Sequence, residues 1–179
     1  MTLPLFTTQE AQEQAVFKAL MWALSRPGEA QPLGVQTEAL SAVGRTLLDL
    51  ETSFYTSDPA LYQTFRRLGA RAEVPERAAY QFFPQVDRSG LEAIGKAPIG
   101  SLLHPEQAAT LVVVSASQAL RLRLRGPGIQ NSRELKLGLP AELWSLREER
   151  VAYPLGWDLF VLEPPYVVGI PRTTRVEVV

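Results

Sequence analysis

The chain has 179 residues, 46% hydrophobic and 21% charged, with a formal net charge of −1, which predicts one globular domain over residues 1–179 and excludes an intrinsically disordered chain. The absence of cysteine excludes disulfides, thiol nucleophiles and sites in which thiolates bind a metal or an iron–sulfur cluster. Because the charge is near neutral, and because no basic leader and no apolar run of membrane-spanning length is present, we expect a cytoplasmic protein that binds neither nucleic acid nor a membrane.

Two helices are predicted before residue 51. Thr7 and Glu10 have the spacing of a capping box, and the helix that they begin stops near residues 26–28, Arg-Pro-Gly. Its apolar face is predicted to consist of Val16, Phe17, Leu20, Met21 and Leu24. Thr37 is expected to cap a second helix, whose core-facing residues are Leu40, Val43, Leu47, Leu48 and Leu50.

Strands and helices alternate in the rest of the chain. Residues 54–55 and 79–83 are predicted strands, and Asp58 with Pro59 begins a helix that ends at Gly69. Residues 87–96 form a short helix or turn, and residues 110–115, TLVVVS, form a central strand because a polar face is missing. The last predicted elements are a helix at 140–149 and two buried strands at 159–162 and 166–170. This order favours an α/β or α+β layered sandwich with a mixed sheet and helices on its faces.

Residues 120–125, LRLRLR, alternate strictly and predict a strand with one apolar and one cationic face. Arg121, Arg123 and Arg125 would lie about 7 Å apart along that face. One interpretation is an edge strand protected by charge against unwanted pairing, which we favour, and the other is a stripe that binds phosphate or a protein partner. A tight turn containing Gly126 and Gly128 ends the strand.

A polar segment, Arg172, Thr173, Thr174 and Arg175, follows the last buried strand directly. Two guanidinium groups and two hydroxyls at the rim of a sheet can bind an anion or the carboxylates of a partner. They can also form hydrogen bonds with their own backbone, which is the usual role of such clusters in loops and the interpretation that spacing favours.

Residues for catalysis are scarce. His104 is the only histidine, and its place before Pro105 is typical of a loop or capping residue. Residues 90–96 have the glycine and lysine spacing of a phosphate loop, but Ala97 replaces the hydroxyl that would bind magnesium, so we reject that motif. Pyridoxal phosphate needs a reactive lysine, and neither Lys18 on its helix nor Lys96 and Lys136 in predicted loops has the setting of one. We therefore expect no cofactor and no metal.

Four segments in order along the chain carry a resemblance to a known family: SRPG at 25–28, LRLRGPGI at 122–129, YPLGWD at 153–158 and IPRTTRVE at 170–177. Together they resemble the PhnH family, whose members are subunits of the bacterial carbon–phosphorus lyase system. The segment containing PRTTRVE is the most specific. Tyr153 stands where phenylalanine is expected, and residues 50–110 contribute little to the match.

The resemblance implies a fold similar to the large domain of pyridoxal-phosphate-dependent transferases, without the cofactor. It also implies a homodimer in isolation and assembly with the G, I and J subunits. In that system, ribose triphosphate from ATP is joined to methylphosphonate, giving α-D-ribose 1-methylphosphonate 5-triphosphate, before a radical step cleaves the carbon–phosphorus bond. The implied role is a non-catalytic or accessory subunit, and no catalytic residue transfers to this sequence.

Two functional interpretations remain for the candidate site residues. In the first, Arg172, Thr173, Thr174 and Arg175 organise the fold or contact other subunits. In the second, the same residues and the turn at Gly126 and Gly128 bind the triphosphate of a nucleotide-derived intermediate. We favour the first, because the sequence shows no general base, metal ligand or activated nucleophile to complete an active site.

Overall fold

The computed structural model describes residues 7–116 and 118–179. The helices are α1 (Thr8–Ser25), α2 (Ala39–Leu47), α3 (Pro59–Arg67), α4 (Arg88–Lys96), the 3-10 turn η1 (Pro105–Gln107) and α5 (Ala141–Arg150). The strands are β1 (Gln31–Pro32), β2 (Ser53–Thr56), β3 (Arg71–Ala72), β4 (Tyr80–Phe83), β5 (Thr110–Val114), β6 (Leu120–Arg125), β7 (Arg133–Leu137), β8 (Asp158–Glu163), β9 (Tyr166–Ile170) and β10 (Arg175–Val178).

A seven-stranded mixed sheet in the order β1-β9-β8-β5-β4-β2-β3 forms the centre of the molecule. Strands β3, β2, β4, β5 and β8 are parallel, and β9 returns antiparallel to β8, with Glu163 opposite Tyr166 at the turn. The prediction that residues 110–115 form a central strand is confirmed, because β5 lies between β4 and β8 and both of its faces are buried.

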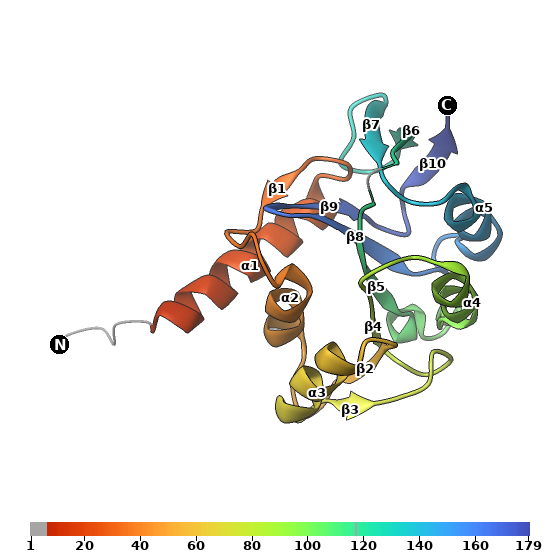
Figure 1. The fold of residues 1–179 in the computed structure, drawn as a ribbon. Coiled ribbons are helices and arrows are strands. Elements are labelled where there is room, and N and C mark those ends of the chain that lie inside the picture. The colour runs from red at the N-terminus through yellow and green to blue at the C-terminus, as the bar shows by residue number, and fades with distance from the viewer. Residues whose placement is uncertain (1–6, 117) are drawn as a thin grey trace.

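Helices cover both faces of this sheet, as predicted (Figure 1). Successive residues of β5 show the division: Val112 packs with α1, α2 and α3, whereas Leu111 and Val113 pack with α4 and α5 on the other face. Each face therefore has its own apolar cluster, and the central strands contribute alternate residues to the two.

Local signals positioned several helices correctly. The capping box of α1 is present, with Thr7 Oγ1 accepting from the Glu10 N–H and Glu10 Oε2 accepting from the Thr7 N–H. Asp58 accepts a hydrogen bond from the Leu61 N–H at 2.8 Å, with Pro59 in the first turn of α3. Both arrangements satisfy N–H groups that a helix start leaves unpaired.

Two helix predictions were wrong in detail. Residue Thr37 is not the cap of α2; that position is Glu38, in a left-handed conformation without a side-chain cap bond. Leu50 lies beyond α2 and is exposed. In α1, Phe17 and Met21 are 55% and 49% exposed, although they were predicted to face the core.

The physical reason for the error in α1 is its close approach to β9. The buried face of the helix consists of Val16, Ala19, Leu20 and Ala23. At Gly169 of β9, a Cβ would lie 2.5 Å from the backbone of Ala23. The helix therefore buries a narrow face rich in alanine, and its larger apolar residues lie outside the contact.

A separate three-stranded antiparallel sheet, β10-β6-β7, lies above the central sheet in Figure 1. Our interpretation of residues 120–125 as an edge strand was wrong, because β6 is the middle strand. Strands β7 and β10 were not predicted, and Lys136 accordingly lies in β7 and not in a loop. Leu122 and Leu124 are fully buried against the α4 and α5 side of the central sheet.

Candidate functional site

The polar segment that follows β9 forms a turn in which the Thr174 N–H donates to the Pro171 carbonyl at 2.9 Å. Arg172, in this turn, is bound within the chain. Its Nη2 and Nε donate to the two oxygens of Asp158 at 2.7 and 3.3 Å, and its Nη1 donates to the Pro105 carbonyl at 2.7 Å. The Arg172 N–H also donates to Asp158 Oδ1. The guanidinium group thus joins the start of β8, the end of β9 and η1, with each of its nitrogens occupied.

Arg147 of α5 lies beneath the same turn and is 3% exposed. Its Nη2 donates to the carbonyls of Pro171 and Thr174 at 2.7 and 3.3 Å, and its Nη1 donates to the Trp157 carbonyl at 3.3 Å. The guanidinium carbon lies 5.2 Å from the centre of the Trp157 ring. Burial lowers the pKa of Arg147 to about 10, and the charge of Asp158 opposes that shift. The residue is therefore a buried cation that holds three carbonyls.

The sequence interpretation missed Arg147. A signal was available, because Arg147 follows Leu143 and Trp144 at helical spacing and so belongs to the buried face of α5. Its charge argued for the solvent face, and sequence alone does not show that three backbone carbonyls converge on it.

The other candidate residues of the turn differ in exposure. Thr174 is buried and its Oγ1 has no hydrogen-bond partner within the part of the chain described, whereas Thr173 is half-buried and Arg175 is exposed. A cleft of about 680 Å³ lies between α5 and the turn. Its lining is formed by Trp144, Arg147, Glu148, Val151, Ala152, Tyr153, Arg172, Thr173, Thr174, Arg175 and Val176.

The glycine turn predicted beside β6 does lie next to this segment. A Cβ at Gly126 would lie 2.8 Å from the Thr173 carbonyl oxygen, and the φ of 152° also disfavours a side chain there. At Gly128, where φ is 80°, a Cβ would lie 2.6 Å from the Ser25 carbonyl oxygen. The structure therefore brings the two groups of candidate residues together, through backbone contacts.

The segments that carry the family resemblance all meet here. Residues 25–28 contact the glycine turn at Gly128, and Arg133 of β7 donates to the Pro27 carbonyl at 2.8 Å. The Gly28 N–H donates to the Gly169 carbonyl, next to the 170–177 segment. Asp158 and Trp157, at the end of the 153–158 segment, hold Arg172 and Arg147. Four stretches distant in sequence are thus joined by backbone contacts at the glycines and by hydrogen bonds from arginine side chains.

A second cleft, of about 620 Å³, lies beyond the carboxyl ends of β4 and β5. Ser115 on its wall donates to Glu163 at 2.7 Å and accepts from the Gly138 N–H at 3.0 Å. The hydroxyl thus uses both its donor and an acceptor site in holding the strand ends together, and its geometry is that of a structural contact.

The other residues considered from the sequence lie outside the two clefts or in regular secondary structure. His104 is exposed beside Glu106 in a loop, and residues 90–96 lie in α4 instead of a phosphate-binding loop. Lys96, the last residue of α4, forms an ion pair with Glu76 at 3.5 Å. Among residues 7–116 and 118–179, no group of three or more His, Asp or Glu side chains is placed to hold a metal ion.

Comparison of the sequence with known protein families identifies the family of this chain. The model of a family described as "Bacterial phosphonate metabolism protein (PhnH)" matches residues 4–177. The chain belongs to the PhnH family. This confirms the resemblance drawn from the four segments, and the match includes residues 50–110, which the segments did not cover.

Two curated relatives agree with the PhnH assignment. One, from Stutzerimonas stutzeri, is named "Putative C-P lyase subunit protein HtxG" and is 37% identical over 174 residues, covering 94% of this chain and 87% of the relative. The other is the "Alpha-D-ribose 1-methylphosphonate 5-triphosphate synthase subunit PhnH" of Rhizobium meliloti (strain 1021), 30% identical over 186 residues, covering 93% and 90%. The similarity therefore extends over nearly all of this chain and most of the length of each relative.

Proposed function

We propose that this chain is a non-catalytic or accessory subunit of a carbon–phosphorus lyase core complex in phosphonate catabolism. In this role it assembles with the G, I and J subunits and supports the formation of α-D-ribose 1-methylphosphonate 5-triphosphate from ATP and methylphosphonate. Membership of the PhnH family and the names of the two relatives support this function.

One observation at the site favours a structural or partner-binding role over phosphate binding. The Nε, Nη1 and Nη2 atoms of Arg172 all donate to Asp158 or to Pro105. A triphosphate would have to displace these bonds, including a bidentate ion pair with 16% exposure at the arginine. Because Gly126 and Gly128 have no side chain, their backbones approach Thr173 and Ser25 closely. This close packing accounts for both glycines without a bound ligand.

The test is the absolute mass in solution of this chain, alone and after co-expression with the G, I and J subunits of its own host. We expect a stoichiometric assembly containing all four proteins, which persists through size-exclusion chromatography. If the chain remains separate from all three partners under conditions in which those three assemble, the subunit function is refuted.

We further infer that the isolated chain is a homodimer formed through α1. The helix extends away from the rest of the molecule toward the N-terminus (Figure 1). Phe17 and Met21 lie one helical turn apart and are each about half exposed. Exposed apolar side chains at this spacing are typical of a helix that packs against another helix.

Glutamates introduced at both Phe17 and Met21 are expected to convert the isolated chain to a monomer of 19.8 kDa with an unchanged melting temperature. The matched control is the pair Leu102→Glu and Leu103→Glu, because these leucines are 76% and 86% exposed in the loop before η1. Light scattering of the three proteins decides the question. A wild-type monomer, or a dimer that survives in the α1 variant, contradicts the inference.

We also propose, from the family resemblance, an architecture like that of the large domain of pyridoxal-phosphate-dependent transferases without the cofactor. From the near-neutral charge and the composition we propose a cytoplasmic location and no nucleic-acid or membrane partner. In the described residues, no helix is both long enough and apolar enough to cross a membrane. Lys96 forms an ion pair with Glu76, and Lys136 lies on the exposed face of β7, so neither has the buried setting of a reactive lysine.

A further inference from the structure

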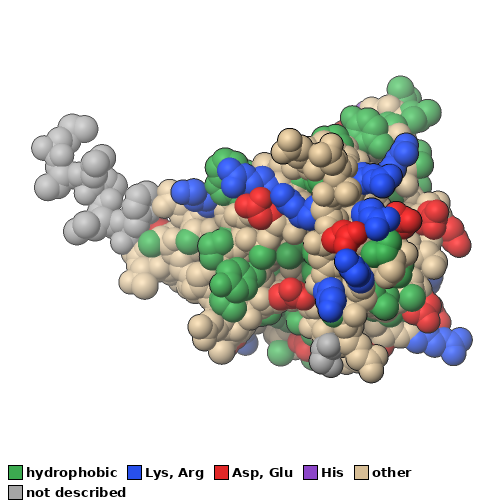
Figure 2. Space-filling view, turned by 90° about the horizontal axis from the view of Figure 1, so that it is seen from above, with side chains coloured by type: hydrophobic (Ala, Val, Ile, Leu, Met, Phe, Trp, Pro, Cys, Tyr) green, Lys and Arg blue, Asp and Glu red, His purple; other side chains and the backbone are tan. Residues whose placement is uncertain are grey.

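The outward face of the small sheet, β10-β6-β7, carries an excess of positive charge to which no role has been assigned above. The inward face of β6 is apolar, with Leu122 and Leu124 fully buried, so Arg121, Arg123 and Arg125 all point outward. Register with the neighbouring strands places Lys136 opposite Arg121, Glu134 and Glu177 opposite Arg123, and Arg175 opposite Arg125. Figure 2 shows Lys and Arg side chains interleaved with Asp and Glu side chains on this side of the molecule.

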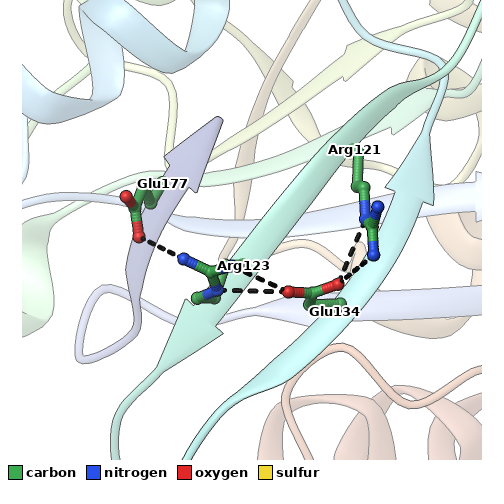
Figure 3. A network of polar contacts seen from close by, with 4 residues as sticks. All are labelled: Arg121, Arg123, Glu134 and Glu177. Carbon is green, nitrogen blue, oxygen red and sulfur yellow. Dashed lines mark hydrogen bonds and ion pairs between the residues drawn. The ribbon is translucent and has the colours of Figure 1, made fainter. Parts of the chain in front are cut away.

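Half of this face is neutralised internally. Glu134 accepts from Arg121 Nη2 at 2.6 Å and from Arg123 Nη2 at 2.9 Å, and Arg123 Nη1 lies 3.5 Å from Glu177 (Figure 3). Hydrogen bonds from Arg123 and Arg121 lower the pKa of Glu134, which keeps its carboxylate charged. Glu134 is therefore engaged with Arg121 and Arg123, and Glu177 is engaged with Arg123.

The other end of the face is not neutralised. Arg125 and Arg175 are direct cross-strand partners, both are exposed, and neither forms an ion pair within residues 7–116 and 118–179. Like charges directly opposite each other on a sheet destabilise it. The outward side chains comprise five cations, Arg121, Arg123, Arg125, Lys136 and Arg175, and two anions, Glu134 and Glu177, an excess of three positive charges on a chain of net charge −1.

The backbone holds Arg125 and Arg175 opposite each other on neighbouring strands. The glycine turn that follows Arg125 packs directly against Thr173 and Thr174, the residues that precede Arg175. Strand register and turn contact therefore hold the pair side by side, although repulsion would separate them. Two adjacent guanidinium groups without internal carboxylates form a ready-made site for an incoming carboxylate.

We propose that this outward face, centred on Arg125 and Arg175, docks against an acidic surface of a partner subunit, with Asp or Glu carboxylates entering between the two guanidinium groups. The inference rests on the proposed function as a component of a larger complex. A protein surface fits better than a small anion, because the face is an open sheet surface: Arg125 lies outside both clefts described above, and only Arg175 of the pair reaches the wall of the cleft beside α5. Arginine is also enriched in protein interfaces, where it pairs with carboxylates.

Arg175→Glu is the sharpest test, since it places a carboxylate opposite Arg125 and so removes both the repulsion and the docking site. The isolated variant is expected to melt at the wild-type temperature or above it. Its affinity for the complex formed by the G, I and J subunits is expected to fall at least about tenfold. Arg67→Glu, an exposed substitution with the same charge change on α3, is the control and is expected to bind like wild type.

Affinity measurement at two salt concentrations, together with the mass of each isolated variant, distinguishes the outcomes. If wild type and Arg175→Glu bind the partners equally, the docking inference fails while the subunit function stands. If wild type itself does not bind, the proposed function fails. The inference is also overturned if Arg175→Glu changes the oligomeric state of the isolated chain, or if millimolar inorganic triphosphate raises the melting temperature of wild type but not of this variant. The first of these results would assign the face to a second copy of this chain, and the second would assign it to a small anion.

Discussion

Replacement of Arg147 by alanine is expected to lower the free energy of unfolding by about 3–5 kcal/mol. The substitution removes the donors that hold the carbonyls of Trp157, Pro171 and Thr174, and leaves a void beside the Trp157 ring. The Pro171 carbonyl keeps the Thr174 N–H, but buried carbonyls that lose a donor are costly, and the turn that carries Arg172 loses its support from α5. Arg147→Met retains most of the side-chain volume, so its loss of stability is expected to be smaller. It avoids the void, although the carbonyls still lose the guanidinium donors.

Urea unfolding monitored by far-UV circular dichroism measures this effect, with Arg67→Ala as a control in which an exposed arginine of α3 is removed. We expect the control to stay within about 0.5 kcal/mol of wild type. Equal midpoints for wild type and Arg147→Ala would show that the turn is held by other contacts. Because Arg147 touches both Trp157 and the turn, near-ultraviolet circular dichroism should also change in the variant.

Gly169→Ala is expected to destabilise the chain by about 3 kcal/mol. The new methyl group would lie 2.5 Å from the backbone of Ala23, and a helix backbone has no rotamer by which to move away. Helix α1 must therefore shift from β9, which also disturbs the hydrogen bond from the Gly28 N–H to the Gly169 carbonyl. Thermal unfolding should show a decrease in melting temperature of about 10 °C for a chain of this length.

Gly95→Ala is the matched glycine control. It lies in α4, where the nearest atoms to a new Cβ are the methyl groups of Leu146 at 3.8 and 3.9 Å. Alanine is the better helix former, so this variant is expected to gain about 0.5–1 kcal/mol. An equal response of the two variants would mean that close packing of α1 on β9 does not limit stability.

Local signals in the sequence predicted most of the elements of the central sheet and its helices. Asp58-Pro59 and the Thr7 capping box act through bonds within a few residues, so their effect can be read without knowing the fold. The apolar runs that became β5, β8 and β9 were equally clear, because strands buried on both faces have no polar alternation.

The small sheet was harder to predict, because its strands are short and are defined by their partners. Strand β7 alternates Leu135 and Leu137 with Glu134 and Lys136, which mirrors the pattern of β6, and this was the available signal. Strand β10 was obscured because Arg175 was grouped with the polar turn. The position of β6 in the middle of the sheet depends on both of these strands, so its classification as an edge strand followed from missing them.

At the candidate site, the sequence identified the turn but not the bonds within it. Arg172 was a plausible anion ligand on composition alone, and only the fold places Asp158 and the Pro105 carbonyl within reach of its donors. In the same way, the opposition of Arg125 and Arg175 arises from strand register, which links residues fifty positions apart. Long-range pairing of this kind leaves no periodic trace in a single sequence.

The order of the strands in the small sheet also bears on synthesis of the chain. The middle strand, β6, is translated before both of its partners, and β10 follows only after β7, α5, β8 and β9. Until β10 has been translated, the backbone N–H and C=O groups on one side of β6 have no partner strand, and such an edge promotes aggregation with other chains. Alternate arginines along β6 oppose such pairing during that interval, so the same charges serve as a safeguard on the ribosome and as part of a surface in the finished protein.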